Sequence, residues 1–424
     1  MTLSRHLCWP SMIALVVLAI GCTDDGLLHG DTLSSPVDAS ASKEIVEAVD
    51  ALDLAIEDAQ ASDGPAEADS NVSDVSRASD DASQDSVADV AAPNAEWGEP
   101  IETKPDSWQW VAFPGTACAD GSQTGLGVNL SPGAKRAFIY FEGGGACWDY
   151  GTCTGLVETS FHLNGFDEGD FNSLLIDVYK NMLFFDRNEP KNPFADAHFV
   201  FIPYCTGDVF AGDNVIELKG LLPWNKETIH FRGAHNVKLY LKRLAPTFFD
   251  VEEVYLAGSS AGGFGAGFSW HRAREAFWPI PVHVIDDSAP PIQPKGGLWE
   301  TWKSAWNMQF PDSCPKCESG LDEVIKFFQE TMLGDAKLAV ISYANDPIIS
   351  TFLNLAPWDF KDGLEELYEA LDTSDNAHYF IVPGILHTML IGQHELVEAP
   401  DGTPLWYWLS NMVSDDEQWT SIKP

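Results

Sequence analysis

The sequence predicts an α/β fold, in which helices flank a mainly parallel sheet and a disordered N-terminal tether precedes it. Three observations support this prediction. Short apolar runs alternate with amphipathic stretches along 97–424, one such run leads directly into a Gly-Ser-Ser-Ala-Gly turn, and residues 23–96 contain no aromatic residue. With 424 residues, 45% of them hydrophobic, the chain can form a large packed core.

Charge excludes two classes of partner. The net charge of −40 argues against a nucleic-acid-binding protein, because such proteins need basic surfaces to displace counterions. It also argues against electrostatic attachment to anionic lipid.

The first 22 residues are typical of a lipoprotein-type signal peptide. Arg5 precedes an apolar run, 12–20, that is too short to span a bilayer. Ala19-Ile-Gly-Cys22 then resembles a bacterial lipobox, which predicts lipidation of Cys22 and export to the cell envelope. Thr23 follows the cysteine and favours the outer membrane or cell surface. An ordinary signal peptide that is cut elsewhere is the alternative.

Residues 23–96 are predicted to form an acidic linker rich in Ala, Ser and Asp. They contain 19 acidic residues and only two basic ones, Lys43 and Arg77. Low hydrophobicity combined with high net charge predicts a solvated, self-repelling tether. A partner-binding arm is the alternative.

The remaining residues, 97–424, are predicted to form one large domain. Strands are expected at 137–141, 198–202, 254–257, 282–285, 338–343 and 379–382, and helices at 236–244, 264–277, 321–332 and 364–371. This alternation predicts a mainly parallel sheet covered by helices, with the functional loops at the carboxyl ends of the strands.

Cysteine content indicates an oxidising compartment. Once Cys8 and Cys22 are assigned to the signal peptide and the anchor, six cysteines remain: Cys118, Cys147, Cys153, Cys205, Cys314 and Cys317. An even number predicts three disulfides, with 15 possible connectivities. Cys147–Cys153 and Cys314–Cys317 are plausible local pairs, which leaves Cys118–Cys205 by subtraction. A zinc site is the rival at Cys314 and Cys317, but no second Cys or His pair stands at zinc-finger spacing, so no metal is expected.

A serine turn is the central motif. The apolar run 254–257 leads into Gly258-Ser-Ser-Ala-Gly262, and a helical stretch follows. A G-x-S-x-G turn between a strand and a helix exposes its central serine, so Ser260 is the expected nucleophile. A glycine-rich strand–helix turn without catalytic function is the alternative.

A serine nucleophile needs a histidine base and an acid that orients it. His387 lies just beyond the last expected strand and is the predicted base, with His394 in reserve. Asp346, three residues beyond strand 338–343, is the predicted acid. Asp286 and Asp287, one strand earlier, are the alternatives for this role.

Backbone donors are expected to stabilise the oxyanion. One is the N–H of Ala261, the residue after the nucleophile, and others come from the glycine-rich loop 143–145 that follows the first expected strand. A phosphate-binding loop is disfavoured, because the Gly-Lys-Ser/Thr ending is missing. Trp148, next to this loop, is expected to face the cleft and bind substrate.

Several blocks of sequence resemble the pectin acetylesterase/Notum family. They match in order over roughly 110–395, namely Phe141-Glu-Gly-Gly-Gly-Ala-Cys-Trp148, the run 192–208, Phe231-Arg-Gly233, Gly258-Ser-Ser-Ala-Gly-Gly263 and Asp286-Asp-Ser288. The resemblance implies an α/β-hydrolase-like fold, a Ser260–Asp346–His387 triad, and oxyanion donors at Gly144, Gly145 and Ala261. The Notum branch has a tryptophan at the place of Gly145 that lines a lipid-accepting pocket, so this chain departs from that branch there.

The predicted function is an exported serine carboxylic-ester hydrolase that removes O-acetyl groups from a polysaccharide through an acyl-enzyme. No cofactor is expected, the partner is an acetylated polysaccharide or a small ester, and a monomer is predicted. Residues 97–424 carry 45 acidic and 21 basic residues, so a neutral or heavily substituted glycan is favoured over polygalacturonate. The alternatives are a hydrolase of lipid or other short-chain esters and a non-catalytic glycan-binding lipoprotein.

Two further features are expected to support the site. Asp208 is predicted to brace an active-site loop through Arg232, with substrate contact as the alternative. The segment 290–317, which is rich in tryptophan, is predicted to cap the cleft.

Overall fold

A computed structural model describes residues 97–154, 160, 162–177, 179, 182–331, 336–391 and 397–424. The predicted signal peptide with Cys22, the predicted linker 23–96 and the reserve histidine His394 lie outside these residues. Within the described ranges, every helix is too short or too polar to cross a membrane.

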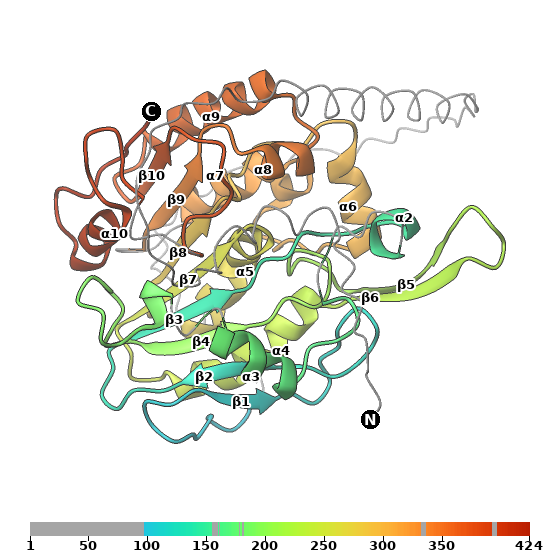
Figure 1. The fold of residues 1–424 in the computed structure, drawn as a ribbon, viewed down its shortest axis with the longest axis horizontal. Helices are drawn as coiled ribbons and strands as arrows, with labels where there is room; N and C mark the ends of the chain where they lie inside the picture. The colour runs from blue at the N-terminus through green and yellow to red at the C-terminus, as the bar shows by residue number, and fades with distance from the viewer. Residues whose placement is uncertain are drawn as a thin grey trace, which may run out of the picture. The chain divides into compact units, whose positions relative to one another are not determined.

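An eight-stranded sheet forms the centre of the fold, in the order β1-β2-β4-β3-β7-β8-β9-β10 (Figure 1). Its strands are β1 (Gln109–Ala112), β2 (Gly125–Asn129), β3 (Arg136–Phe141), β4 (His198–Ile202), β7 (Glu253–Ser259), β8 (Val282–Asp287), β9 (Leu338–Tyr343) and β10 (Ala377–Val382). The six strands from β4 to β10 in this order are parallel, and β2 and β1 add antiparallel pairs at one edge. The predicted mainly parallel sheet is confirmed.

Burial explains why the parallel strands could be recognised. Every residue of β8 and of β9 is buried, because helices cover both faces of the sheet. Strands buried on both faces appear as continuous apolar runs, which is the pattern in the sequence. β1 and β2 were not predicted, since β1 is largely half-exposed and β2 contains two glycines.

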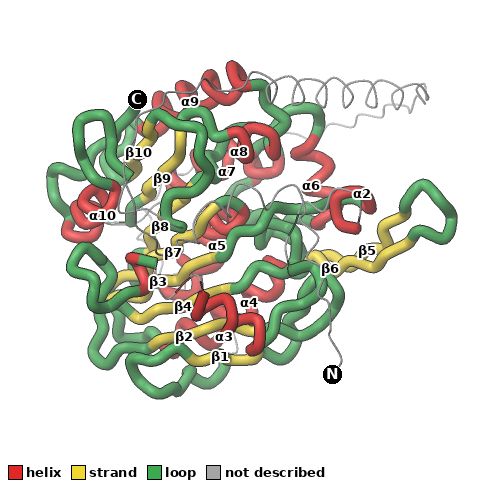
Figure 2. Tube along the Cα trace, viewed as in Figure 1, coloured by secondary structure: helices red, strands yellow, loops and turns green. Residues whose placement is uncertain are grey.

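Helices lie on both faces of the sheet (Figure 2). The described helices are α2 (Tyr150–Thr154), α3 (Glu168–Asp177), α4 (Gly233–Thr247), α5 (Ala261–Phe277), α6 (Leu298–Trp306), α7 (Leu321–Thr331), α8 (Pro347–Phe352), α9 (Pro357–Leu371) and α10 (Leu405–Ser414). Apolar residues of α4, α5, α7 and α9 share one core with Ile139 and Phe141. Those of α10 share the other with Phe138 and Tyr140, so alternate side chains of β3 face opposite layers.

A separate two-stranded hairpin was not predicted. β5 (Asn214–Lys219) and β6 (Lys226–Phe231) pair antiparallel and project from the body of the domain in Figure 1. The backbone of Asp213 at the start of the hairpin is fixed to α6, because its N–H donates to the carbonyl of Trp306 at 2.9 Å.

Three disulfides join the six cysteines of the domain. The pairs are Cys118–Cys205, Cys147–Cys153 and Cys314–Cys317. This connectivity is one of the 15 that the sequence allowed, and it leaves neither Cys314 nor Cys317 free to bind zinc.

The turn between β7 and α5 depends on close backbone contacts. A Cβ atom on Gly258 would clash with the carbonyl of Gly262, and one on Gly262 would clash with the carbonyl of Phe141 in β3. The start of α5 therefore lies directly against the end of β3. Ser260, between these glycines, has a φ of 57°, in the left-handed region that side chains disfavour.

We predict that Gly262→Ala destabilises the domain by about 2 kcal/mol or more, because the added methyl group meets backbone that cannot move aside. Gly267→Ala in the same helix is the matched control, since a Cβ atom there would meet no other described atom within 4 Å. This control should be neutral or more stable by ~0.5–1 kcal/mol. Denaturant unfolding of the three proteins measures both effects, and equal stability of Gly262→Ala and wild type would contradict the prediction.

Candidate active site

Ser260 is held at the tip of the strand–helix turn. Its N–H donates to the carbonyl oxygen of Asp287 at 2.7 Å, which ties the turn to the end of β8. Its side chain makes no capping hydrogen bond to α5. The hydroxyl of a serine at a helix N-terminus commonly caps the helix, so here it remains available for other chemistry.

Asp346 and His387 form a buried pair. Nδ1 of His387 lies 2.6 Å from Oδ2 of Asp346, which is fully buried. The other oxygen, Oδ1, accepts hydrogen bonds from the N–H groups of Ile348 and Ile349 at 3.0 and 3.2 Å, so Asp346 also caps α8. A carboxylate can only accept, so Nδ1 is assigned as the donor, and in the neutral imidazole Nε2 then presents its lone pair.

The free nitrogen of His387 is suited to accept a proton. Within the described part of the chain, Nε2 is buried and has no hydrogen-bond partner. Ser260, Asp346 and His387 follow β7, β9 and β10, whose carboxyl ends share one edge of the parallel sheet. The three predicted residues therefore lie at the edge where such folds carry their sites, although no hydrogen bond joins Ser260 to Nε2 of His387.

The alternative acids have other partners. Asp287 accepts hydrogen bonds from the hydroxyl of Ser259 and from the N–H groups of Met389 and Leu390, and Asp286 accepts one from the N–H of Ala289. Burial raises the pKa of both carboxyl groups above the usual range. The acid that hydrogen-bonds the ring of His387 is Asp346.

The glycine-rich loop lies against the serine turn. A Cβ atom on Gly143 would lie 3.3 Å from Cβ of Ser260 and would clash with the carbonyl of Ser259. Gly145 has a φ of 77° and pairs with Ser160 in an isolated bridge. Ala261 is the first residue of α5, so its N–H has no acceptor within the helix.

Glu142 fixes the start of this loop, a role that the sequence did not suggest. It is buried, and its Oε2 accepts a hydrogen bond from the N–H of Tyr204 at 2.9 Å, while the hydroxyl of Tyr179 lies 3.4 Å from Oε1. Burial raises the pKa of Glu142 to about 8, and these two hydrogen bonds oppose the shift. The loop after β3 is thereby attached to the segment after β4.

Asp208 braces the segment after β4, but not through Arg232. Its carboxylate accepts hydrogen bonds from the hydroxyl of Thr206 at 2.6 Å and from the N–H groups of Phe210 and Gly233 at 3.1 and 2.8 Å. Arg232 pairs with Asp213 instead, so the prediction that Asp208 acts through Arg232 is wrong. Burial raises the pKa of Asp208 to about 6.

Trp148 is half-buried in an aromatic cluster beside the glycine-rich loop. Its ring centroid lies 5.9 Å from that of Trp302 in α6 and 6.3 Å from that of Phe352 in α8. Trp306 donates from Nε1 to the carbonyl of Cys147 at 2.8 Å. The tryptophans of α6 therefore pack against the segment that follows the glycine-rich loop. The predicted substrate contact of Trp148 and the predicted capping role of 290–317 stay predictions.

Exposed apolar side chains flank the Asp346–His387 pair. Ile385 and Leu386, which directly precede His387, are 72% and 58% exposed. Ile348, two residues after Asp346, is 45% exposed. The edge of the site beside the imidazole is therefore apolar.

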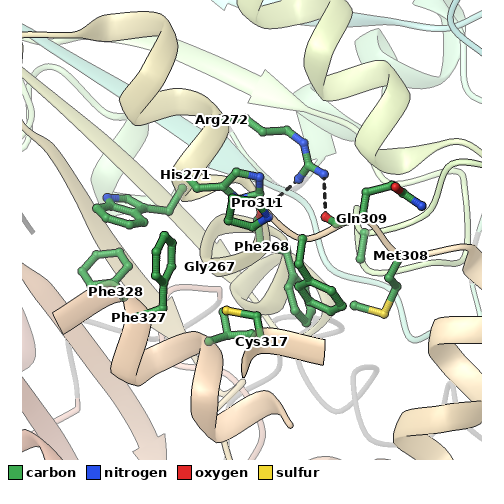
Figure 3. Close-up of a pocket in the computed structure, with 14 residues that line it drawn as sticks. Gly267, Phe268, His271, Arg272, Met308, Gln309, Pro311, Cys317, Phe327 and Phe328 are labelled. Atoms are coloured by element: carbon green, nitrogen blue, oxygen red, sulfur yellow. Dashed lines mark hydrogen bonds between the residues drawn. The ribbon is translucent and has the colours of Figure 1, made fainter. Parts of the chain in front are cut away.

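A separate pocket lies between α5, the segment 308–317 and α7 (Figure 3). Arg272 in its wall donates to the carbonyl oxygens of Phe268 and Gln309 at 3.1 and 3.0 Å. Its lining includes neither Ser260 nor the Asp346–His387 pair. Among the residues that the structure describes, no group of three or more His, Cys, Asp or Glu side chains is placed to hold a metal ion.

Part of the chain is similar to known esterases. A family model described as pectinacetylesterase matches residues 109–289. The palmitoleoyl-protein carboxylesterase NOTUM of Schmidtea mediterranea is 30% identical over 195 residues, which cover 43% of this chain and 34% of that protein. The protein of the same name from Homo sapiens is 28% identical over 160 residues, covering 37% of this chain and 30% of that protein. The chain thus spans about a third of the length of these relatives.

A solved structure shares the fold. The crystal structure of the Wnt deacylase Notum from Drosophila superposes with a TM-score of 0.54 and 19% sequence identity. The match covers 74% of this chain and 95% of that chain. At this identity the match concerns the fold alone, and it confirms the predicted α/β-hydrolase-like architecture.

Burial of Glu142 predicts a pH dependence of stability. Its folded-state pKa of about 8 lies above its ordinary value of 4.5, so between these values the folded state retains a proton that the unfolded state releases. Stability should therefore fall as pH rises from about 5 to 8, by at most ~1.4 kcal/mol per pH unit from this group.

Thermal unfolding between pH 5 and 8 tests this expectation. Glu142→Gln, which keeps a neutral polar side chain, should flatten the dependence, whereas Glu300→Gln at an exposed glutamate should leave it unchanged. An identical slope in Glu142→Gln and wild type would refute the assignment.

Proposed function

We propose that this chain, which is similar to members of the pectin acetylesterase/Notum family, is a carboxylic-ester hydrolase with Ser260 as its nucleophile. One observation carries this proposal: the Asp346–His387 pair at 2.6 Å leaves Nε2 of the imidazole buried, and without a partner among the described residues, at the edge of the sheet that bears Ser260. An imidazole held in this tautomer is prepared to act as a general base.

The proposed reaction proceeds in two steps. In the first, Nε2 of His387 takes the proton of the Ser260 hydroxyl as Oγ attacks the acyl carbonyl, and the alcohol leaves with that proton, so that an acyl-enzyme forms. In the second, His387 takes a proton from water as the water attacks the acyl carbonyl, the bond to Oγ breaks, Oγ regains the proton from His387, and the carboxylic acid is released. Asp346 keeps the imidazole oriented and stabilises its protonated form.

The negative charge of the tetrahedral intermediate requires donors. We assign these to the N–H groups of Ala261, Gly144 and Gly145. The contact between the glycine-rich loop and Ser260 supports this assignment, as does the position of Ala261 at the N-terminus of α5, where the helix dipole favours an anion.

For the substrate, we favour O-acetyl groups on a neutral or heavily substituted polysaccharide. The family model that matches the chain is named for pectin acetylesterase. The excess of acidic residues in 97–424 disfavours an unsubstituted polyuronate chain. Trp148 is the proposed contact for a sugar ring.

A second candidate is the hydrolysis of esters with a longer acyl chain. The exposed side chains of Ile348, Ile385 and Leu386 beside the Asp346–His387 pair favour it, since apolar surface at a cleft edge suits an apolar group. The relatives named palmitoleoyl-protein carboxylesterase agree with this candidate, and the glycine at position 145 argues against it.

Export and anchoring complete the proposal. We propose that 1–22 is a lipoprotein signal, that lipidated Cys22 anchors the chain in the envelope, that 23–96 is the tether and that 97–424 is a monomeric hydrolase domain. The sequence from Ala19 to Cys22 and the acidic composition of 23–96 support this arrangement.

We predict that Ser260→Ala lowers kcat/KM toward 4-nitrophenyl acetate by at least ~1,000-fold without loss of folding. Ser269→Ala is the matched control, because Ser269 is a buried serine in α5, the helix that directly follows Ser260. The full chain with its disulfides formed should be assayed with acetyl, butyryl and octanoyl esters. A preference for acetyl supports the favoured substrate, and a preference that rises with acyl length supports the second candidate. Equal activity of wild type and Ser260→Ala would contradict both.

A further inference from the structure

A buried carboxylate connects the serine turn to the histidine loop. Asp287 is the last residue of β8 and is fully buried. Its carbonyl oxygen accepts the N–H of Ser260 at 2.7 Å, and its Oδ2 accepts the hydroxyl of Ser259 at 2.6 Å. Both residues of the turn are therefore fixed to one aspartate.

The same carboxylate holds the backbone that follows His387. The N–H of Met389 lies 2.8 Å from Oδ1 and 3.0 Å from Oδ2 of Asp287, and the N–H of Leu390 lies 2.9 Å from Oδ2. Ser288 extends the same connection, because its hydroxyl donates to Oδ1 of Asp287 at 3.1 Å and its oxygen accepts the N–H of Thr388 at 3.0 Å. The three bonded N–H groups belong to the residues that directly follow His387 in the chain.

We propose that Asp287 is a positioning residue that fixes the loop of His387 relative to Ser260. The proposal rests on the proposed esterase function, in which the imidazole must reach the serine hydroxyl. Asp346 orients the ring of His387, whereas Asp287 places the backbone that carries the ring. A general base loses efficiency steeply when it is displaced by ~1 Å, so this placement controls the rate.

Further contacts make the connection rigid. The hydroxyl of Tyr140 donates to the hydroxyl oxygen of Ser259 at 2.9 Å, and Ser259 in turn donates to Asp287, so every donor in this buried series has a partner. Tyr140 lies in β3, the strand that leads into the glycine-rich loop. Removal of the carboxylate would leave the hydroxyls of Ser259 and Ser288 and the two backbone N–H groups without these acceptors.

Asp286 provides a matched control. It is adjacent to Asp287 and also buried, but its carboxylate accepts the nearby N–H of Ala289 instead of the N–H groups after His387. A general cost of altering a buried aspartate at the end of β8 would affect both residues. A positioning effect would affect Asp287 alone.

The test compares Asp287→Ala, Asp287→Asn and Asp286→Asn in the full chain. For Asp287→Ala we expect kcat toward 4-nitrophenyl acetate to fall ~100-fold with KM changed less than ~3-fold. Asp287→Asn retains one acceptor oxygen, so its kcat should fall only ~10-fold. Asp286→Asn should stay within ~3-fold of wild type in kcat.

Hydrogen exchange gives a readout that does not require activity. In Asp287→Ala the amides of Met389 and Leu390 should exchange at least ~10-fold faster than in wild type and in Asp286→Asn. Wild-type kcat or unchanged exchange in a folded Asp287→Ala overturns the proposal. If Asp287→Ala does not fold, the test uses Asp287→Asn. A wild-type kcat together with wild-type exchange of the Met389 and Leu390 amides in that variant overturns the proposal. An inactive wild type would refute the proposed function, while exchange would still test the connection.

Discussion

The contact between the end of β3 and the start of α5 is the constraint on which the site depends. Gly262 lies so close to the carbonyl of Phe141 that no side chain fits between them, and Gly258 meets Gly262 in the same way. This close approach requires a sharp turn at Ser260. The residue therefore adopts a φ of 57°, a backbone conformation that is unfavourable for a residue with a side chain. It also brings the glycine-rich loop after β3 against the serine turn.

Buried carboxyl groups fix the loops at this edge of the sheet. Glu142 accepts the N–H of Tyr204, Asp208 accepts that of Gly233, Asp346 caps α8, and Asp287 holds the loop after His387. Loops have few backbone hydrogen bonds of their own, so a buried acceptor that satisfies their N–H groups gives them a defined position. In a chain of such acidic composition, these four acids serve an internal structural purpose.

Features that depend on short stretches of sequence could be predicted from the sequence alone. The parallel strands appeared as apolar runs because both of their faces are buried, and Ser260, Asp346 and His387 could be proposed because each follows a strand whose carboxyl end had been recognised. The beginning of α5 was placed at Phe264 rather than Ala261, because Ala-Gly-Gly has weak helix propensity and only its packing against β3 makes it helical.

Features that depend on tertiary partners could not be predicted. The partner of Arg232 is Asp213 rather than Asp208, a choice set by the fold of the intervening segment. Asp287 was considered only as an alternative triad acid, since its partners Met389 and Leu390 lie about a hundred residues further along the chain. The antiparallel strand β2 and the β5–β6 hairpin have too few buried apolar residues to stand out.

The central claim is that His387 activates Ser260. It is tested most directly by labelling the full chain with a fluorophosphonate, which reacts with activated serines, and by locating the adduct with peptide mass spectrometry. The account predicts a single adduct on Ser260 that forms at least ~100-fold more slowly in His387→Ala. A folded wild-type protein that forms no adduct, or forms it at another residue, would contradict the account.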